Sequence, residues 1–497
     1  MQKGVETSPA SRSWWGEDRS EERPRAQAQP TPARPVPRAM DKEECAERSR
    51  RRCAASAFIL AAATGFLAIA VLGLRPVGQG VRAAEPADAL AVLKASFARP
   101  TFIPHPAGNP PTAAKIALGK RIFEDVELSA NGTIACASCH DAKLGFADGE
   151  PKGKGVTGRR LVRHTPSLWN LAWSPLLFWD GRASSLEDQI RFPIEHPDEM
   201  GSSLENGVDR FSRHDSYVRA FAEAFPTEDP HISPRTIGQA LAAYERTLVS
   251  PPTRFDRWVA GELGALTPSE LAGFAIFTGK GRCSSCHAGF AFTDNGFYDI
   301  GLPGSDMGRG AQIGLSAADH AFKTPTLREL SWTAPYMHDG SLATLDDVVR
   351  HYESGGVARS TRSRDLPQGL ALSERERSDL VTFLEALSSE TPPQPSREAW
   401  VSAAMPVART PPADTTLVSE ANKLFHPQYV RVRSGELLSV LNDDTRTHNV
   451  RIYDPRFDYN SGAQEPRETV TIRFPGPGTF EAFCAIHPSM RLTVVVE

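Results

Sequence analysis

The chain has 497 residues, which is too long for one hydrophobic core and suggests roughly three domains. Its 56 basic and 60 acidic residues give a formal net charge of -4, and this near balance gives no reason to expect a nucleic-acid partner. The 40 prolines and 38 glycines predict many loops and at least one extended linker.

The N-terminal region is predicted to lack a core and to lead into an apolar helix. Residues 1–52 are rich in Arg, Glu, Pro, Ser and Ala, so we expect a disordered, basic and proline-rich N-terminus, with Met40 as an alternative start. Residues 53–74 are uncharged and long enough for a membrane-spanning helix of roughly 20 residues. They are predicted to form a signal anchor, with a cleavable signal peptide ending at "VRA" (81–83) as the alternative. Because basic residues precede the apolar run, the rest of the chain is expected in the periplasm, anchored to the inner membrane if the helix is not cleaved.

Two mainly helical units are predicted next, at 85–265 and 266–390. The segment "ISPRTIGQALAAYERTLV" has apolar residues at helical spacing. The segment "LTPSELAGFAIFTGKGRCSSCH" offers a Thr cap before Pro268 and then an amphipathic run into a C-x-x-C-H motif. A helix, a C-x-x-C-H motif and loops occur in both units, so we expect an internal repeat of architecture.

The composition and the pattern of apolar residues change after residue 390. Residues 391–416 contain "TPPQPSREAW" and "RTPPAD", which predicts a semi-rigid proline-rich linker. Residues 417–497 alternate apolar and polar residues in short runs such as "QYVRVRSGELLSVLN" and "RLTVVVE". This pattern predicts a small all-β sandwich.

The two C-x-x-C-H motifs, "CASCH" and "CSSCH", are typical of covalent attachment of c-type haem. Two thiols bind the porphyrin and the adjacent His supplies an axial nitrogen to the iron. A zinc site or a redox dithiol is the alternative, but two copies that both end in His in an exported chain favour haem. The predicted ligands are Cys136, Cys139 and His140 in the first motif and Cys283, Cys286 and His287 in the second.

Two longer segments resemble a known family. "HTPSLWNLAWSPLLFWDGRASSLEDQIRFPIEHPDEMG" lies between the motifs, and "KTPTLRELSWTAPYMHDGSLATLDDVVRHY" follows the second. Over roughly residues 95–390 the chain is similar to bacterial di-haem cytochrome c peroxidases and their MauG-like relatives. The resemblance implies two cytochrome-c-like haem domains, the first peroxidatic and the second for electron transfer.

The resemblance also implies site residues around the first haem. Glu199 matches the distal carboxylate, a base that takes a proton from the near oxygen of peroxide and returns it to the leaving oxygen. Gln189 matches an amide that lines the same pocket, and Trp179 matches the tryptophan between the two haems. The alternatives are a solvated surface carboxylate for Glu199 and a packed core aromatic for Trp179.

The family places a calcium ion between the haems. The resemblance assigns carbonyl ligands to Thr333 and Pro335, whereas His164 stands where the family usually has an Asn ligand. Calcium prefers oxygen ligands, so this substitution weakens the expectation of calcium. Either the ion binds through carbonyls and water, or the site is altered.

The resemblance also implies a sixth ligand for the second haem. In the peroxidases it is a Met about fourteen residues after the "HDG" histidine, and counting from His338 leads to Tyr352. MauG-like enzymes carry a Tyr at this place. A phenolate favours ferric and higher oxidation states, whereas a thioether raises the potential. The alternative is a helix residue that packs on the haem edge.

The C-terminal region contains a predicted copper site. His448 lies upstream of a loop in which Cys484, His487 and Met490 follow one another as C-x-x-H-x-x-M. Two His and one Cys with a weak axial Met are the ligands of type 1 copper. Residues 417–497 resemble amicyanin and other plastocyanin-like cupredoxins; a free Cys and a surface Met are the alternative.

Three functions are considered. We favour a di-haem c-type peroxidase that reduces hydrogen peroxide to water at the first haem, with electrons passed from a tethered type 1 copper domain through the second haem. The first alternative is a MauG-like enzyme that uses peroxide or oxygen to oxidise a partner protein. The second is a non-enzymatic, membrane-tied electron relay. Expected partners are hydrogen peroxide, an electron-donor protein or the quinol and cytochrome chain, a protein substrate for the MauG-like alternative, and a second copy in a homodimer.

Overall fold

The computed structural model describes residues 86–367, 369–396, 401–404 and 413–497. The predicted disordered N-terminus 1–52 and the predicted apolar helix 53–74 lie outside the described residues. Within the described part of the chain, no helix combines the length and apolar character that crossing a membrane requires.

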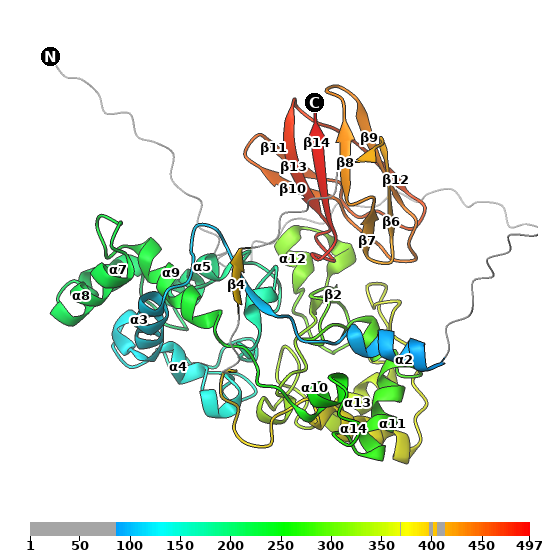
Figure 1. The fold of residues 1–497 in the computed structure, drawn as a ribbon, viewed down its shortest axis with the longest axis horizontal. Helices are drawn as coiled ribbons and strands as arrows, with labels where there is room; N and C mark the ends of the chain where they lie inside the picture. Colours follow the sequence, from blue (N-terminus) through cyan, green and yellow to red (C-terminus); the bar gives the residue numbers. More distant parts are fainter. Residues whose placement is uncertain (1–85, 368, 397–400, 405–412) are drawn as a thin grey trace, which may run out of the picture. The chain divides into compact units, whose positions relative to one another are not determined.

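The first helical region is organised around the packing of α3 on α9 (Figure 1). Thr112 caps α3, and Ser233 forms a capping box with Thr236 at the start of α9, where Pro234 occupies the first turn. The helices bury a common apolar core that includes Ile122, Phe123 and Leu241. The elements of this region are β1 (Phe102–His105), α3 (Ala113–Glu124), α4 (Cys136–Cys139), α5 (Leu186–Gln189), α6 (Arg191–Glu195), α7 (Leu204–Phe211), α8 (Asp215–Ala224) and α9 (Pro234–Glu245). The preceding helix α2 (Pro86–Ala95) packs through Leu93 against the core of the second helical region instead.

The second helical region repeats this plan, with α11 packed on α14. The predicted Thr cap is confirmed: Thr267 and Glu270 form a capping box, and Pro268 begins α11. Gly273 permits the close approach of the helices, since a Cβ there would lie 2.1 Å from the Asp379 carbonyl oxygen. The elements are α10 (Arg254–Val259), α11 (Pro268–Thr278), β2 (Phe297–Tyr298), α12 (Arg309–Ile313), β3 (Phe322–Lys323), α13 (Leu345–Ser354) and α14 (Glu374–Glu385).

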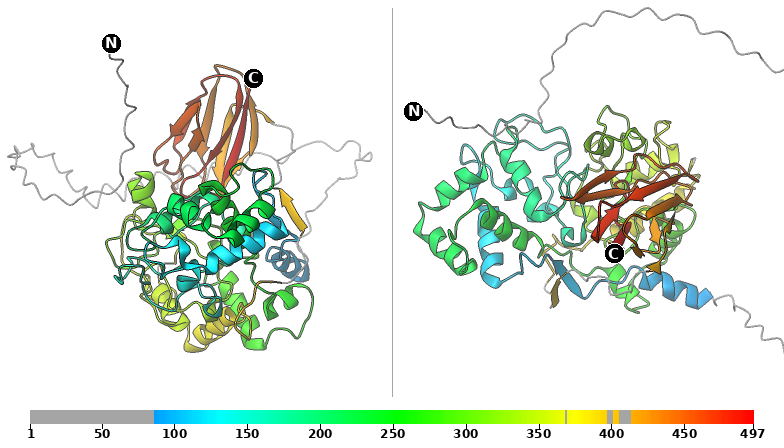
Figure 2. Two further views of the ribbon diagram at one scale, coloured as in Figure 1. Left: turned by 90° about the vertical axis from the view of Figure 1, so that its left-hand side faces the viewer. Right: turned by 90° about the horizontal axis from the view of Figure 1, so that it is seen from above.

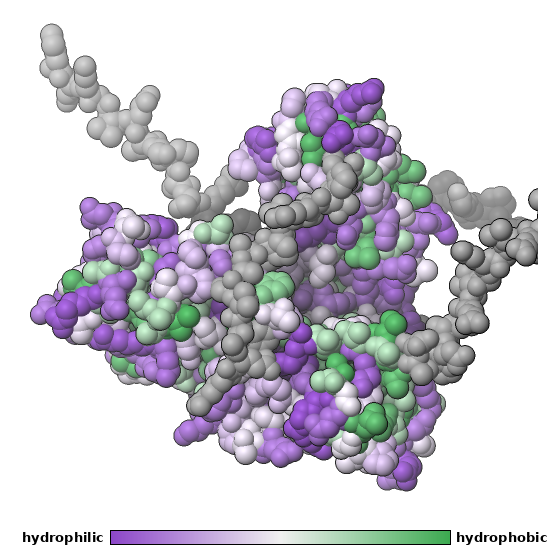
Figure 3. All heavy atoms as spheres, in the orientation of Figure 1, coloured by the Kyte–Doolittle hydropathy of each residue, from purple (hydrophilic) through white to green (hydrophobic). Residues whose placement is uncertain are grey.

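The predicted β-rich C-terminal region is confirmed as two sheets (Figure 2). One has the strand order β11-β10-β13-β14-β8-β5 and the other β12-β9-β6-β7. Alternate residues of β9 are buried, as the alternation of apolar and polar residues predicts. On the surface, Figure 3 shows mainly hydrophilic residues at the upper end of this region. The strands are β5 (Ala413–Asp414), β6 (Leu417–Ala421), β7 (Leu424–His426), β8 (Tyr429–Val432), β9 (Leu437–Asn442), β10 (Arg451–Asp454), β11 (Phe457–Asn460), β12 (Thr469–Arg473), β13 (Gly478–Phe483) and β14 (Arg491–Val496).

Two short strands fall inside the predicted linker 391–416. β4 (Val401–Ala404) pairs in parallel with β1, and β5 pairs in parallel with β8. An extended backbone can pair wherever a strand edge is within reach, so an extended linker and these pairings are compatible. Residues 397–400 and 405–412 of the linker lie outside the described residues.

The β-sheet region and the second helical region share one apolar core. Phe297, Ala318 and Ala321 belong to the same buried cluster as Val440 and Ile486. In the described residues, the β-sheet region therefore packs directly on the second helical region in addition to being joined to it by the linker. The apolar side chains that close this contact are far apart in the sequence, and no local pattern marks them.

Candidate functional site

The first C-x-x-C-H motif forms α4 and presents an oriented imidazole. The His140 Nδ1 atom lies 2.8 Å from the Phe146 carbonyl oxygen, which can only accept, so Nδ1 donates and Nε2 keeps its lone pair. Burial lowers the pKa of His140 and so favours the neutral ring. Cys136 and Cys139 are free thiols, and burial raises their pKa to about 12 and about 11.

The second motif repeats this geometry at Cys283–Ser285 and the two residues that follow. His287 Nδ1 lies 2.8 Å from the Phe292 carbonyl oxygen, and burial lowers the pKa of the ring. Cys283 and Cys286 are free thiols whose pKa is raised by burial to about 12. Phe146 and Phe292 both have positive φ, so the same tight turn brings each carbonyl back to its histidine.

These residues fit a covalently bound porphyrin with an axial histidine at each motif. In each motif two thiols precede a histidine. A hydrogen bond from Nδ1 holds the ring in place, so Nε2 keeps a lone pair for the iron. Near the first motif, Trp169 Nε1 and Glu245 Oε2 are buried and lack a hydrogen-bond partner among the described residues. The indole Nε1 is a donor, and a haem propionate oxygen would be a suitable acceptor for it.

The predicted distal carboxylate lies near the first motif. Burial raises the pKa of the half-buried Glu199 carboxyl, and the charges of His196 and Arg182 oppose that shift. The Glu199 charge in turn contributes to the raised pKa of Cys139. Gln189, the last residue of α5, is half-buried ten positions before Glu199.

A neighbouring loop fixes the backbone of Glu199. The Val156 amide donates to the Glu199 carbonyl oxygen over 2.8 Å. A Cβ on Gly155 would lie only 2.4 Å from that oxygen, so the loop can approach this closely only with glycine.

Trp179 lies where the two helical regions meet. Its indole Nε1 donates to the His164 carbonyl oxygen over 2.9 Å, and its own carbonyl oxygen accepts from the Lys323 amide over 2.8 Å. The His164 amide donates to the His338 carbonyl oxygen over 2.8 Å. The segments before and after the second motif are thus joined through the tryptophan.

The predicted calcium residues lie in the same area. A Cβ on Gly145, just after the first motif, would be 2.7 Å from Thr333 Cγ2, and Pro335 follows two residues later. The His164 Nδ1 atom lies 2.9 Å from the Glu150 carbonyl oxygen and is engaged there as a donor. Calcium ligation by Thr333 and Pro335 stays a prediction.

Tyr352 lies on α13, close to the second motif. Burial raises the pKa of the phenol, with further contributions from the Cys286 and Cys283 thiols. His351, its neighbour, is held by a 2.9 Å contact between Nε2 and the Ile300 carbonyl oxygen. Tyr352 therefore lies near the second motif, and its ligation of iron stays a prediction.

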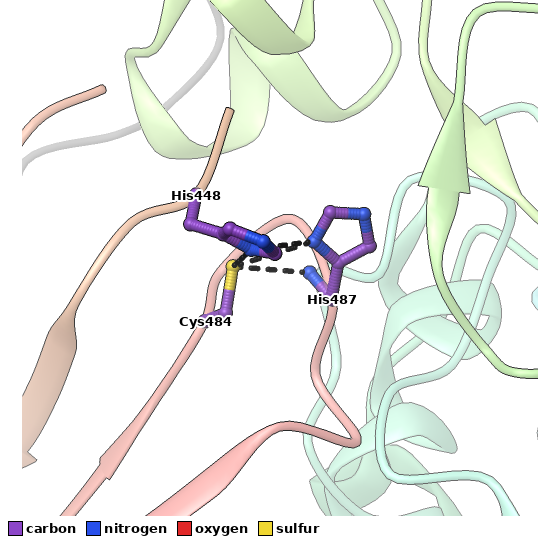
Figure 4. Close-up of side chains that lie close together, drawn as sticks. All are labelled: His448, Cys484 and His487. Carbon is purple, nitrogen blue, oxygen red and sulfur yellow. Dashed lines mark hydrogen bonds between the residues drawn. The ribbon is translucent and has the colours of Figure 1, made fainter. Parts of the chain in front are cut away.

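Three of the predicted copper ligands converge in the β-sheet region (Figure 4). Cys484 Sγ lies 3.8 Å from His448 Nδ1 and 3.7 Å from His487 Nδ1, and the two nitrogens are 3.2 Å apart. Among the described residues this is the one group of at least three His, Cys, Asp or Glu side chains close enough to share a metal ion. Met490 is fully buried, and its carbonyl oxygen accepts from the Cys484 amide over 3.2 Å, which closes the loop.

The surroundings of these side chains suit a metal site. His448 Nε2 lies 3.2 Å from the Asp444 carboxylate, to which it donates. Nδ1 therefore keeps its lone pair and faces Cys484 and His487, where a metal ion would bind. Burial raises the pKa of Cys484 to about 12 and lowers that of His487. The Cys484 sulfur also accepts from the His487 amide over 3.4 Å. Two imidazoles, a buried thiol and a thioether are the donor set of type 1 copper.

Sequence analysis missed several polar residues around these motifs. Asp444 could have been noticed, because ligand histidines commonly bond a carboxylate through their second ring nitrogen and Asp444 is the nearest preceding carboxylate to His448 in the sequence. Tyr298, Asp294 and Lys423 had no such signal. Lys423 joins the other two only because the β-sheet region contacts the segment after the second motif.

Comparison with known proteins agrees with this geometry. A family model for di-haem cytochrome c peroxidase matches residues 113–264. The chain is 47% identical over 304 residues to the methylamine utilization protein MauG of Methylorubrum extorquens, covering 61% of this chain and 86% of that protein. It is 37% identical over 329 residues to the cytochrome-c peroxidase IdrP1 of Denitromonas iodatirespirans, covering 58% and 85%. A solved MauG-like protein associated with microbial copper homeostasis aligns with a TM-score of 0.56 at 33% identity, covering 59% of this chain and 95% of that one.

Two haem-attachment motifs in paired helical regions define a c-type cytochrome with two haem sites. The chain belongs to the di-haem cytochrome c peroxidase family, in which MauG is also found, and it is an oxidoreductase of the cytochrome c peroxidase type. The resemblance noted from the sequence is confirmed for this part of the chain.

Proposed function

We propose that the protein reduces hydrogen peroxide to water at the first haem motif, with electrons supplied through the second motif from copper in the β-sheet region. The observation that carries the peroxide proposal is the position of Glu199, half-buried near the first motif. A haem bound at His140 supplies an iron that activates peroxide.

The chain's own residues transfer protons and orient the substrate. Glu199 takes the proton from the near oxygen of peroxide and delivers it to the leaving oxygen, which departs as water. Burial raises the pKa of Glu199 toward neutral pH. A carboxyl whose pKa lies near the working pH can both accept and release a proton effectively. Gln189 orients the substrate, and Trp179 lies on the route along which electrons arrive. Each peroxide consumes two electrons and two protons.

The copper proposal rests on the convergence of His448, Cys484 and His487, and the buried Met490 of the same loop would complete the donor set. We infer a cupredoxin from the two sheets and this donor set. Copper-loaded wild type should show an absorption band near roughly 600 nm, from charge transfer between thiolate and copper, and Cys484→Ser should lose it. If the copper-loaded wild type lacks the band, the copper proposal is wrong.

A MauG-like oxidation of a partner protein is the second candidate. Two observations favour it: a tyrosine rather than a methionine lies beside the second motif, and identity to MauG is higher than to the peroxidase. A copper donor within the same chain argues against it, because it would return electrons to the oxidised haems. An electron relay without chemistry would not need a carboxylate near the first motif.

Steady-state turnover of hydrogen peroxide with a reduced cupredoxin or cytochrome donor distinguishes these functions. The peroxidase proposal expects turnover that consumes two donor electrons per peroxide. Two low-spin haems in the electron paramagnetic resonance spectrum, with no turnover, would support the relay instead. We further propose export to the periplasm and a donor from the quinol or cytochrome chain.

A further inference from the structure

The proposed copper loop lies directly against the segment that follows the second haem motif. The Phe297 amide donates to the Ile486 carbonyl oxygen over 3.0 Å, and Ser489 Oγ donates to the Asp294 carbonyl oxygen over 2.8 Å. The His487 ring centroid lies 5.7 Å from that of Tyr298, and His487 is only 4% exposed. The chain itself therefore covers this ligand, and an external donor cannot reach its ring directly.

Lys423, the sole lysine in 413–497, reaches from the β-sheet region to the haem motif itself. Its Nζ atom donates to the Ser285 carbonyl oxygen over 2.7 Å and to Asp294 Oδ2 over 2.9 Å. Ser285 lies between the two cysteines of the motif. A charge-assisted bond to this carbonyl fixes the position of the β-sheet region relative to the porphyrin attachment site.

Tyr298 connects the imidazole to the motif. Its hydroxyl donates to Asp294 Oδ2 over 2.6 Å, and the Asp294 amide donates to the Cys286 carbonyl oxygen over 2.8 Å. Lys423 Nζ lies 4.8 Å from the centroid of the tyrosine ring. A series of direct contacts thus runs from His487 through Tyr298 and Asp294 to Cys286.

Further contacts hold this arrangement on both sides. Arg309 donates from Nε to the Ala485 carbonyl oxygen over 3.0 Å and from Nη1 to the Gly181 carbonyl oxygen over 2.9 Å. Arg446 Nε donates to Asp365 Oδ2 over 2.7 Å. Together with the shared apolar core, these bonds describe a docked surface rather than a domain that searches on a tether.

We propose that Tyr298, Asp294 and Lys423 form a fixed electron-transfer junction between the His487 side of the copper loop and the second C-x-x-C-H motif. The proposal rests on the proposed function, because it takes copper as the ion of the loop. Each crossing moves one electron: a cuprous ion becomes cupric and the ferric second haem becomes ferrous. No bond forms or breaks, and Tyr298 keeps its proton on the hydroxyl bonded to Asp294. An external one-electron donor protein then reduces the copper again.

The junction can be tested by transient kinetics on the fully loaded protein. Copper is reduced by a short pulse of a chemical radical, and its absorption band and that of the ferrous haem are followed with time. Tyr298→Leu, which removes the ring beside His487, and Lys423→Gln, which removes the charge at Ser285, should each slow the transfer several-fold. Tyr298→Phe keeps the ring and should slow it less than Tyr298→Leu.

Controls separate the junction from general damage and from the copper proposal. Tyr459→Phe and Arg473→Gln, in β11 and β12, should leave the rate unchanged, and all variants should retain the copper band and haem spectra. The wild-type rate should not depend on protein concentration or on solvent viscosity. Wild-type rates in both Tyr298→Leu and Lys423→Gln, or a rate that falls with viscosity, would overturn the junction. A missing copper band in the wild type would instead overturn the copper proposal, and the junction with it.

Discussion

At the scale of single residues, Glu199 determines the expected pH dependence of peroxide reduction. A proton acceptor must be ionised, and burial raises the pKa of this carboxyl. We therefore expect kcat/KM for peroxide to fall on acidification through an apparent pKa above the roughly 4.3 of a free Glu. Glu199→Gln should lower turnover by about 10²–10⁴-fold and abolish this pH dependence.

Glu205→Gln provides a matched control for this experiment. It makes the same chemical change at an exposed position in the first turn of α7, and it should leave turnover unchanged. If Glu199→Gln turns over peroxide like the wild type, Glu199 is only a partly buried carboxylate with no part in proton transfer.

Tyr352 determines the potential expected for the second haem. If its phenolate ligates the iron, Tyr352→Met replaces an anionic oxygen by a thioether and should raise the reduction potential of that haem. A redox titration of the second haem's absorption measures the shift. Tyr336→Phe, in the same region, removes a hydroxyl that is bonded to the Leu330 carbonyl oxygen and should leave the potential unchanged. An unchanged spectrum in Tyr352→Met would identify Tyr352 as a packing residue.

At the scale of structural elements, the loop at 153–160 is predicted to position Glu199. Gly155→Ala would place a methyl group 1.9 Å from the Asp198 carbonyl oxygen, so the 198–199 backbone must move. Displacements of about 1 Å can cost on the order of 10²-fold in rate, so peroxide turnover should fall while haem content stays normal. Gly264→Ala, where nothing lies within 4 Å of the added Cβ, is the control. Normal turnover in Gly155→Ala would show that the loop yields without moving the carboxylate.

A buried ion pair is predicted to hold α10 to the segment after the second motif. Arg328 Nη1 lies 2.7 Å from Asp256 Oδ2, and the guanidinium is fully buried. Although burial alone would raise it, the charge of Arg328 holds the pKa of Asp256 below its usual value. Arg328→Met removes the two-bond guanidinium partner of this buried carboxylate and leaves it the Thr253 amide at 2.8 Å and Arg99 at 3.9 Å, which should cost about 3 kcal/mol in the free energy of unfolding.

Denaturant unfolding followed by haem absorption measures this effect. Arg375→Met removes an exposed partner of Asp379 and should cost about 1 kcal/mol or less. Because the Asp256 pKa is depressed, the contribution of the pair is present at neutral pH and is lost as pH falls through the folded-state pKa. An Arg328→Met protein as stable as the wild type would contradict the prediction.

The sequence correctly predicted those helices, strands and turns whose formation depends on residues close together in the chain. The capping box at Thr267, the helix at α9, the alternation in β9 and the C-x-x-C-H turns all depend on residues within a few positions of one another. The C-x-x-H-x-x-M spacing of the loop Cys484–Met490 likewise predicted a metal site from residues close together in the sequence. In contrast, Lys423 meets Tyr298 and Asp294 across more than a hundred residues, and each of the three has an ordinary surface or core role when it is considered alone.

At the scale of the whole molecule, all the described residues, which begin at Pro86, belong to one compact unit. The β-sheet region contributes Ile486 to a core that also contains Phe297, and it contributes Lys423 to the haem motif. Ligand binding in one region should therefore change stability in the other, because the shared contacts form together. Independent domains on a flexible linker would not show this coupling.

Copper removal should reveal this coupling through amide hydrogen exchange. Copper bound by His448, Cys484 and His487 stabilises the loop, and at a hundred times its dissociation constant it adds about 2.7 kcal/mol. Since the Phe297 amide donates to the Ile486 carbonyl oxygen, its exchange should be slower in copper-loaded protein than in copper-free protein with both haems attached. Amides of α9 are the internal control and should be unchanged. Protection that stops within 484–490, with Phe297 unaffected, would show that the loop and the second haem region open independently.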